Sequence, residues 1–193
     1  MGVAERKTRE RAERQDRIVA SARLIAENEG WDAVTIRRLA SEIEYSQPVL
    51  YSHFANRDAI VAAVAVEGFK ELTSVLREAS GNTAGHQEAL SAVGAAYFDF
   101  ARRRPALYEA MFVLPVQLQF AENDTRSELQ SAFQAIATTV SPFCADVDTV
   151  TETFWAALHG LAQLEASGRI RPAMHHKRLA FIVQAIVDAG SNE

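Results

Sequence analysis

The residues with the clearest chemical potential lie between Ser46 and Ile60, in the stretch SQPVLYSHFANRDAI. A proline, a tyrosine and a histidine stand among polar side chains, and a helix-start signal, Asn56-Arg57-Asp58, follows them. A buried helix would not carry so many polar groups, and a helix exposed only to water would have no use for the aromatic ones. The mixture is typical of a helix whose outer face binds another surface of mixed polarity.

The major groove of DNA is such a surface. Ser46 and Gln47 are short polar groups at the tip of a helix predicted over residues 46–53, and a glutamine amide can hydrogen-bond to base edges. Pro48 fits the first helical turn, because the N–H that it lacks is unpaired there in any case. Together with Val49, its ring offers an apolar contact to a thymine methyl group.

Neighbouring residues suit the DNA backbone. Tyr51 and His53 are amphipathic side chains that can reach phosphate oxygens. Arg57 stands at the start of the next helix, where its charge and the free N–H groups both favour phosphate. A short helix is predicted just before, over residues 35–43, with Thr35 as its N-cap. Two short helices with a brief connection match a helix-turn-helix, whose second helix enters the major groove.

The rest of the chain predicts helices only. Five prolines and nine glycines punctuate 193 residues, and no hairpin dipeptide separates alternating apolar runs. We therefore expect an all-α fold of about nine helices: a three-helix head that contains the helix-turn-helix, a long fourth helix, and a C-terminal helical bundle. The first helix should stop near Gly30. The later ones are predicted at about 56–79, 86–104, from Pro105, at 123–144, from Asp146 or Asp148 to Gly168, and at 173–190.

Residues 4–17 allow two interpretations. They are of mixed charge and offer favourable i→i+4 pairs, Glu10 with Arg14 and Glu13 with Arg17, which predict a solvated extension of the first helix. The alternative is a flexible arm on DNA phosphates. The net charge of −5 argues against binding nucleic acid over the whole surface, and a slight basic excess, ten Lys and Arg against nine Asp and Glu, is confined to residues 1–57.

Several classes of function are disfavoured. The single cysteine, Cys144, rules out an intrachain disulfide and suits a cytoplasmic location. No run is long and apolar enough to span a bilayer, so we expect no membrane association. The sequence has no P-loop, no Gly-x-Ser-x-Gly and no metal-ligand spacing, so we expect no catalytic residues, metal or cofactor. An enzyme and a non-specific architectural DNA-binding protein remain the alternatives.

The segment GWDAVTIRRLASEIEYSQPVLYSHFANRDAIVAAV, Gly30–Val64, resembles the TetR family of transcriptional regulators. Its most specific part is the aromatic-x-His-Phe ending, Tyr51–Phe54, followed by Asn56-Arg57. That family is dimeric, binds near-palindromic operators, and usually represses until a small ligand binds its C-terminal domain. The resemblance implies a DNA-binding domain over residues 1–60, and a domain for ligand binding and dimerisation over residues 61–193.

The resemblance also implies DNA contacts at matching positions. The implied contacts to phosphates are Thr35, Tyr51, His53 and Arg57, and those to bases are Arg37, Gln47, Pro48 and Val49. The chain departs from the family at the helix-turn-helix turn, where Glu44 replaces the usual glycine of positive φ at a cost of about 1 kcal/mol. The next residue, Tyr45, replaces a small aliphatic one and is predicted either to join the core or to contact DNA.

The segment TFWAALHGLAQLEASGRI, Thr153–Ile170, resembles a TetR subgroup named for a Trp-His-Gly motif, here Trp155, His159 and Gly160. Trp155 and His159 are four residues apart and share a helix face. With other aromatic residues they would line an apolar pocket for a small-molecule effector, although ordinary core packing explains each of them equally well. The candidate ligand-binding residues are Tyr97, Phe98, Tyr108, Met111, Phe112, Phe120, Trp155 and His159.

Apolar residues at helical spacing in the last two helices predict a homodimer. On a monomer this stripe would expose a contiguous apolar surface. Two such helices from each subunit would form a four-helix interface, as the resemblance also implies. The candidate interface residues are Leu158, Leu161, Phe181, Ile182, Ala185 and Ile186.

Overall fold

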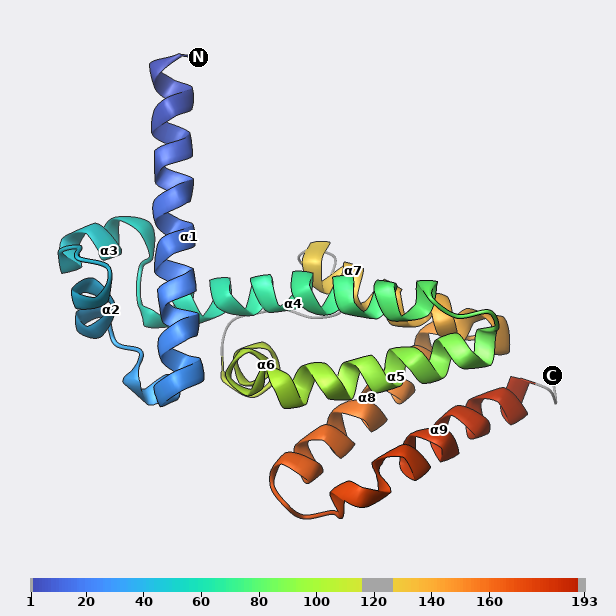
Figure 1. Ribbon diagram of the computed structural model, residues 1–193. Helices are drawn as coiled ribbons and strands as arrows, with labels where there is room; N and C mark the ends of the chain where they lie inside the picture. Colours follow the sequence, from blue (N-terminus) through green and yellow to red (C-terminus); the bar gives the residue numbers. More distant parts are fainter. Residues whose placement is uncertain (1, 116–126, 191–193) are drawn as a thin grey trace. The chain divides into compact units, whose positions relative to one another are not determined.

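The computed structural model describes residues 2–115 and 127–190 (Figure 1). Within these ranges it contains nine α-helices and three 3-10 turns and no strand, so the all-α prediction is confirmed. The elements are α1 Val3–Glu29, η1 Trp31–Ala33, α2 Ile36–Glu42, α3 Gln47–His53, α4 Arg57–Gly81, α5 His86–Arg103, α6 Pro105–Phe112, α7 Ser127–Val140, η2 Ser141–Phe143, α8 Val147–Ala166, η3 Pro172–Met174 and α9 His175–Gly190.

Short polar side chains set the helix starts, as predicted. The side-chain oxygens of Thr35, Asn56 and Asp146 each accept a hydrogen bond from the backbone N–H three residues on, at 3.1, 2.8 and 3.2 Å. Gly30 ends α1 with a φ of 83°, a conformation that favours glycine. None of the helices in the described ranges is long and apolar enough to cross a membrane.

The chain packs as two compact units, and the division falls inside α4. The first unit is Met1–Gly68 with Arg104–Gln119, and the second is Phe69–Arg103 with Phe120–Glu193. In the first, α1 packs against α2, α3, η1 and α6. Trp31 is buried there and donates its Nε1–H to the carbonyl oxygen of Ala106, at 2.8 Å. The contact ties η1 to α6 across 75 residues of sequence.

The second unit is a bundle in which α5 contacts α7, α8 and α9. Its core includes the fully buried Tyr97, Phe154 and Leu158. Gly94 of α5 lets α9 approach closely, because a Cβ atom there would lie 2.4 Å from a methyl group of Leu179. The small residue therefore helps to fix α9 in the bundle.

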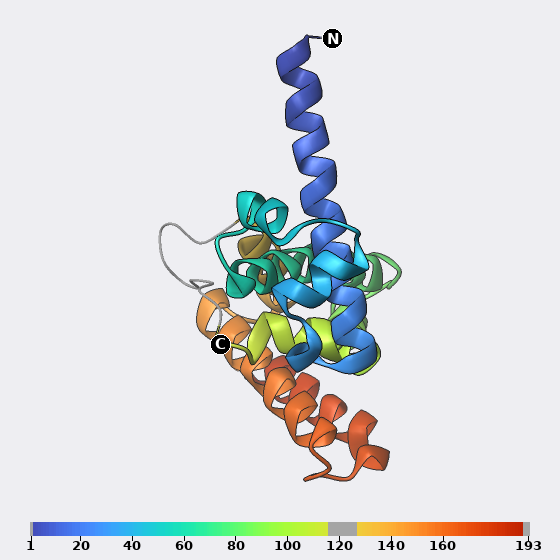
Figure 2. The ribbon, with the colours of Figure 1, turned by 90° about the vertical axis from the view of Figure 1, so that its left-hand side faces the viewer.

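The N-terminal half of α1 projects beyond α2 and α3 (Figures 1 and 2). Its side chains are mostly exposed from residue 4 to residue 17, so the predicted helical extension is confirmed. The i→i+4 ion pairs differ from the predicted ones, however. Glu10 pairs with Arg6 at 3.6 Å and Glu13 with Arg9 at 3.5 Å, so each glutamate pairs with the arginine before it rather than the one after.

Candidate nucleic-acid interface

The N-terminal tip of α3 presents the predicted base-reading residues to solvent. Ser46 occupies the N-cap position, but its side chain makes no capping hydrogen bond, so its hydroxyl is not used by the helix. Gln47 and Pro48 are exposed, and Val49 is half-buried. Leu50 is fully buried and anchors the opposite face of the helix in the core. The tip is therefore rigidly held while its polar and apolar groups point outward.

The two arginines at the start of α2 differ in whether their side chains are already paired. Arg38 pairs with Glu29 at 3.0 Å and with Glu42 at 3.2 Å. Its hydrogen bond to Glu29, together with the charges of both glutamates, raises the pKa of Arg38. Arg37 is exposed, and its side chain has no hydrogen bond or ion pair with any residue that the structure describes. Of the two cations, Arg37 is thus the one with no contact in the described residues to give up on binding a base edge or a phosphate.

Arg57 has a structural role that the sequence did not reveal. Its Nε–H donates to the carbonyl oxygen of Val34 at 2.8 Å, and its Nη2 group donates to that of Trp31 at 2.6 Å. The guanidinium thereby holds the turn between α1 and α2. Its Nη1 group lies 3.8 Å from a carboxylate oxygen of Asp58. Since a guanidinium has five N–H donors, a phosphate contact by Arg57 remains a prediction that would use the donors left over.

Arg57→Ala is expected to lower the free energy of unfolding of the first unit by roughly 1–3 kcal/mol, because two carbonyl acceptors lose a charged donor. Arg57→Lys should retain part of this stability, since an ammonium can serve one carbonyl at a time. The measurement is urea unfolding followed by Trp31 fluorescence in a Trp155→Phe background. Arg37→Ala is the matched control and should change stability by less than about 0.5 kcal/mol. An unchanged urea midpoint for Arg57→Ala would mean that the two contacts do not stabilise the unit.

The turn between α2 and α3 adopts the conformation that the sequence comparison anticipated. Glu44 has a φ of 57°, and it is the one non-glycine residue of positive φ in the described part of the chain. A left-handed glutamate is strained, so this turn costs about 1 kcal/mol relative to glycine. Tyr45 is half-buried. Its hydroxyl accepts a hydrogen bond from Arg17 at 2.9 Å, and the guanidinium carbon of Arg17 lies 5.1 Å from the ring centre. Tyr45 therefore binds α1 rather than filling the core.

The predicted phosphate contacts lie on the outer side of the same unit. Tyr51 is 54% exposed, and Thr35 is exposed beside its capping bond. His53 is half-buried. Burial, followed by the charges of Arg11 and Arg14, lowers the pKa of His53 and so favours its neutral form. A neutral imidazole can still donate one N–H to a phosphate oxygen.

The structure brings some of the candidate ligand-binding residues together. Trp155 is half-buried, and its Nε1–H donates to the hydroxyl oxygen of Tyr97 at 3.1 Å. His159 lies one turn further along α8. It is half-buried too, and burial lowers its pKa, so at pH 7 it offers one donor and one acceptor. Phe98 is buried and packs edge-on against His175, with ring centres 4.3 Å apart.

Other candidates lie elsewhere. Tyr108, Met111 and Phe112 belong to α6 and thus to the first compact unit, where the rings of Tyr108 and Phe112 are 4.8 Å apart. Phe120 lies outside the described residues. Of the candidates in the second unit, Trp155 and Tyr97 are in contact and His159 lies one turn from Trp155, so an effector site at these residues remains a prediction.

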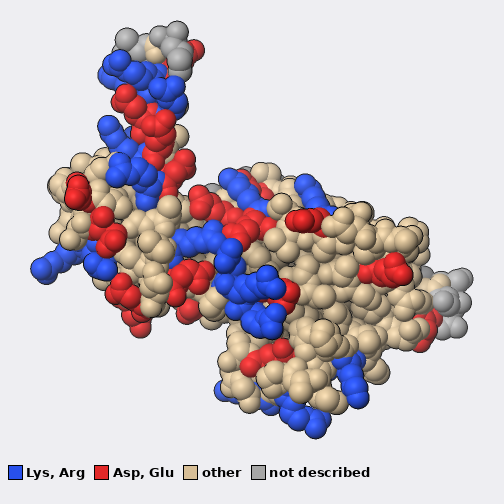
Figure 3. All heavy atoms as spheres, in the orientation of Figure 1, with Lys and Arg blue, Asp and Glu red and all other residues tan. Residues whose placement is uncertain are grey.

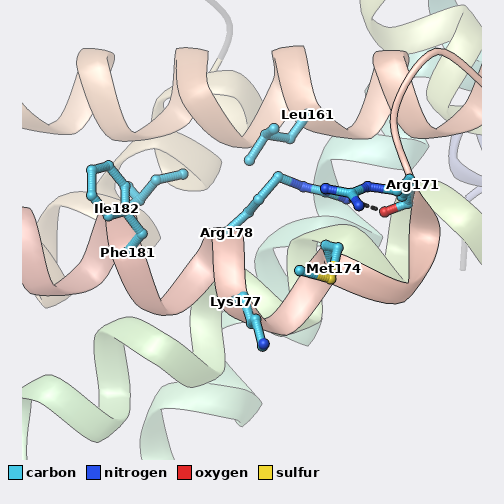
Figure 4. A pocket seen from close by; sticks show the side chains of 7 residues that line it. All are labelled: Leu161, Arg171, Met174, Lys177, Arg178, Phe181 and Ile182. Carbon is cyan, nitrogen blue, oxygen red and sulfur yellow. Dashed lines mark hydrogen bonds between the residues drawn. The ribbon is translucent and has the colours of Figure 1, made fainter.

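Part of the outer surface of α8 and α9 is apolar. Phe181 is 76% exposed, Ala185 is exposed, and Leu161, Ile182 and Ile186 are half-buried; we call these five residues the α8–α9 patch. Leu158, the sixth candidate for the dimer interface, is instead fully buried in the core of its own unit. Beside the patch lies a hollow of about 420 Å³ (Figure 4). It is lined by Leu161, Arg171, Met174, Lys177, Arg178, Phe181 and Ile182.

Comparison with sequence models of known families shows to which family the chain belongs. The model described as "Bacterial regulatory proteins, tetR family" matches residues 18–64, which include the helix-turn-helix. The model described as "Tetracyclin repressor-like, C-terminal domain" matches residues 90–189. The chain belongs to the TetR family of transcriptional regulators.

Individual TetR-like relatives agree with this assignment. An uncharacterized HTH-type transcriptional regulator of Mycobacterium tuberculosis is 26% identical over 157 residues, which cover 80% of this chain and 71% of the relative. The HTH-type transcriptional activator FasR of Mycolicibacterium smegmatis is 29% identical over 136 residues, or 70% of this chain and 57% of FasR. Both are regulators of transcription by name.

A solved structure shows the same fold. The transcriptional regulator FadR from Bacillus subtilis, crystallised with stearoyl-CoA, superposes with a TM-score of 0.65 and covers 90% of this chain and 97% of its own. The two sequences are 11% identical, so the likeness concerns the fold alone.

Proposed function

We propose that this TetR-family regulator binds a near-palindromic operator as a homodimer and represses transcription until a small effector releases it. The observation that carries the proposal is the tip of α3. There Ser46, Gln47 and Pro48 are exposed, while Leu50 fixes the helix from behind. A DNA-binding protein needs this arrangement, because its base-reading groups must be both accessible and held in one orientation.

Each contact then has a chemical role. Gln47 and Arg37 would hydrogen-bond to base edges, and Pro48 with Val49 would contact a thymine methyl group. The remaining candidates would position the head on the DNA backbone. They are Thr35, Ser46, Tyr51, His53 and Arg57. Such a regulator acts where the chromosome is, which places it in the cytoplasm.

Dimerisation would pair two heads on one operator. Recognition helices must lie about 34–36 Å apart to enter successive major grooves on one side of the duplex. We assign the subunit contact to the α8–α9 patch, because its exposed apolar side chains would be covered by the same patch of a second subunit in a two-fold arrangement. We also propose that residues 1–60 form the DNA-binding domain and that residues 61–193 form the domain for effector binding and dimerisation.

The effector would be a largely apolar molecule that binds near Trp155 and His159. The imidazole would supply a polar contact that orients it, beside the indole whose N–H donates to the hydroxyl of Tyr97. The stearoyl-CoA bound to FadR, a protein of similar fold, makes a long-chain acyl-CoA the first probe to test. An effector that prefers another spacing of the two heads lowers operator affinity by its differential affinity for the two states.

Gln47→Ala is expected to weaken binding to the operator by roughly 1–3 kcal/mol and to relax the base preference at the position it reads. The operator would first be selected from random duplexes by the wild-type protein, and affinities would then be measured against single-base variants of it. Ser41→Ala, an exposed α2 residue outside the predicted contacts, is the control.

The same assay separates the proposal from non-specific architectural binding. Wild-type binding to the selected operator should survive excess mixed-sequence DNA, since specific binding is typically about 10³-fold or more tighter. Equal affinity of the wild type for the operator and for mixed-sequence DNA would establish the architectural alternative instead.

A further inference from the structure

Three cations lie in a row on the projecting part of α1. Lys7, Arg11 and Arg14 are spaced i, i+4 and i+7, so they share one face of the helix; we call them the basic stripe. All three are exposed. One turn further on, the same face carries Ile18, which is fully buried in the core of the first unit. The face that packs the core thus continues, beyond the core's edge, as a line of positive charge.

The acidic residues of this segment pair with other cations. Glu10 lies one helical turn from both Lys7 and Arg14, but its carboxylate pairs with Arg6, and Glu13 pairs with Arg9. By contrast, the side chains of Lys7 and Arg14 make no hydrogen bond or ion pair with any residue in the described ranges. Figure 3 shows both basic and acidic side chains along the projecting part of α1.

The basic stripe adjoins the predicted DNA surface. The Nη2 group of Arg11 donates to the backbone carbonyl of Ser52, near the end of α3, at 3.0 Å. The charges of Arg11 and Arg14 also reach His53, where they contribute to its lowered pKa. His53 is one of the proposed phosphate contacts. The row of cations therefore begins where the α3 contacts end and runs away from them along α1.

We propose that the basic stripe binds phosphates of the duplex that flanks the half-site read by α3. The inference rests on the proposed function and extends it to DNA outside the helix-turn-helix footprint. Like charges at i, i+4 spacing destabilise a helix in water, and a polyanion relieves that repulsion. From Lys7 to Arg14 the helix rises by about 10 Å, while each DNA strand carries a phosphate about every 3.4 Å of duplex axis. More than one phosphate is thus within reach of the two unpaired cations.

The test compares two double variants of equal charge. Lys7→Ala with Arg14→Ala removes the unpaired cations and leaves Arg11 on the end of α3, and Arg6→Ala with Arg9→Ala removes the two cations that pair with Glu10 and Glu13. Both exchanges introduce alanine, the best helix former, so α1 should remain folded, as circular dichroism would verify. Affinity is measured against salt concentration on the selected operator, with flanks of either 2 or 10 base pairs.

For wild type we expect tighter binding to the duplex with long flanks. On that duplex, Lys7→Ala with Arg14→Ala removes four cations from the proposed dimer, two in each subunit, and should reduce the slope of log K against log salt by about 3.6, since each phosphate contact contributes about 0.9. The gain from long flanks should disappear as well. The Arg6→Ala, Arg9→Ala pair should change the slope by less than half as much.

Two results would overturn the inference. If both double variants reduced the slope equally, net charge and not the basic stripe would be responsible. If Lys7→Ala with Arg14→Ala kept the wild-type slope and flank gain, the row would have no DNA contact, although operator binding itself would stand. Failure of the wild type to bind any duplex would instead refute the proposed function, and this inference with it.

Discussion

Phe181→Glu with Ala185→Glu is expected to convert the proposed dimer into a monomer and to weaken operator binding about 100-fold or more. Both residues are exposed on one face of α9, and Phe181 is 76% exposed. Two glutamates in each subunit would place like charges at the centre of a two-fold interface and desolvate them there. A monomer keeps its reading head but loses the gain from joining two heads, which is typically about 10²- to 10⁴-fold.

The molar mass from sedimentation equilibrium and the operator affinity report the two effects separately. Because the exchanged side chains are exposed, the isolated subunit should stay folded and keep its helical circular dichroism. Ala180→Glu adds a charge to an exposed position of α9 outside the α8–α9 patch, and it should remain dimeric. A double variant that sediments with the wild-type mass would remove the α8–α9 patch from the subunit interface.

Trp155→Phe and His159→Gln are expected to reduce the release of operator by an effector, a response that typically spans about 5- to 150-fold. Trp155→Phe preserves an aromatic ring and removes the N–H that donates to Tyr97. His159→Gln preserves polar contacts and removes the imidazole. The response to an effector found by screening should fall, while operator affinity without effector should stay within about threefold of wild type.

Phe133→Leu on α7, a half-buried aromatic position outside the candidate set, controls for general loosening of the second unit. Urea unfolding of each variant would distinguish a binding role from a packing role. If both variants responded to effector as wild type does, the effector site would lie away from α8. If the variants lost stability and effector response in proportion, ordinary core packing would explain Trp155 and His159.

Local features of the fold were predictable because local interactions determine them. Thr35, Asn56 and Asp146 each satisfy an N–H three residues away, and Gly30 supplies the positive φ that ends α1. The same holds for the position of α3, whose Pro48 suits a first helical turn and whose Leu50 faces the core. The positive φ of Glu44 followed from comparison with the family pattern. The turn keeps the left-handed backbone conformation although glycine, the usual residue there, is absent.

Contacts between residues far apart in the chain could not be predicted from the sequence. Arg57 reads as a phosphate contact, and nothing local shows that it holds carbonyl oxygens 23 and 26 residues earlier. The bond from Trp31 to Ala106 crosses 75 residues, so the packing of α6 with the first unit could not be inferred either. Aromatic candidates posed another difficulty, because core packing and ligand binding both place aromatic side chains in apolar surroundings.

The projecting half of α1 is an already formed helix rather than a flexible arm, and this alters how it would select DNA. A disordered arm loses conformational entropy when it binds, but adapts to the path of the duplex. Cations on a continuous helix are ordered beforehand and cannot follow the DNA, so the DNA must deform to meet them. Flanking sequences that bend easily toward α1 would then be favoured even though no side chain reads their bases. The stiffness of one helix would thus appear as a sequence preference outside the half-site.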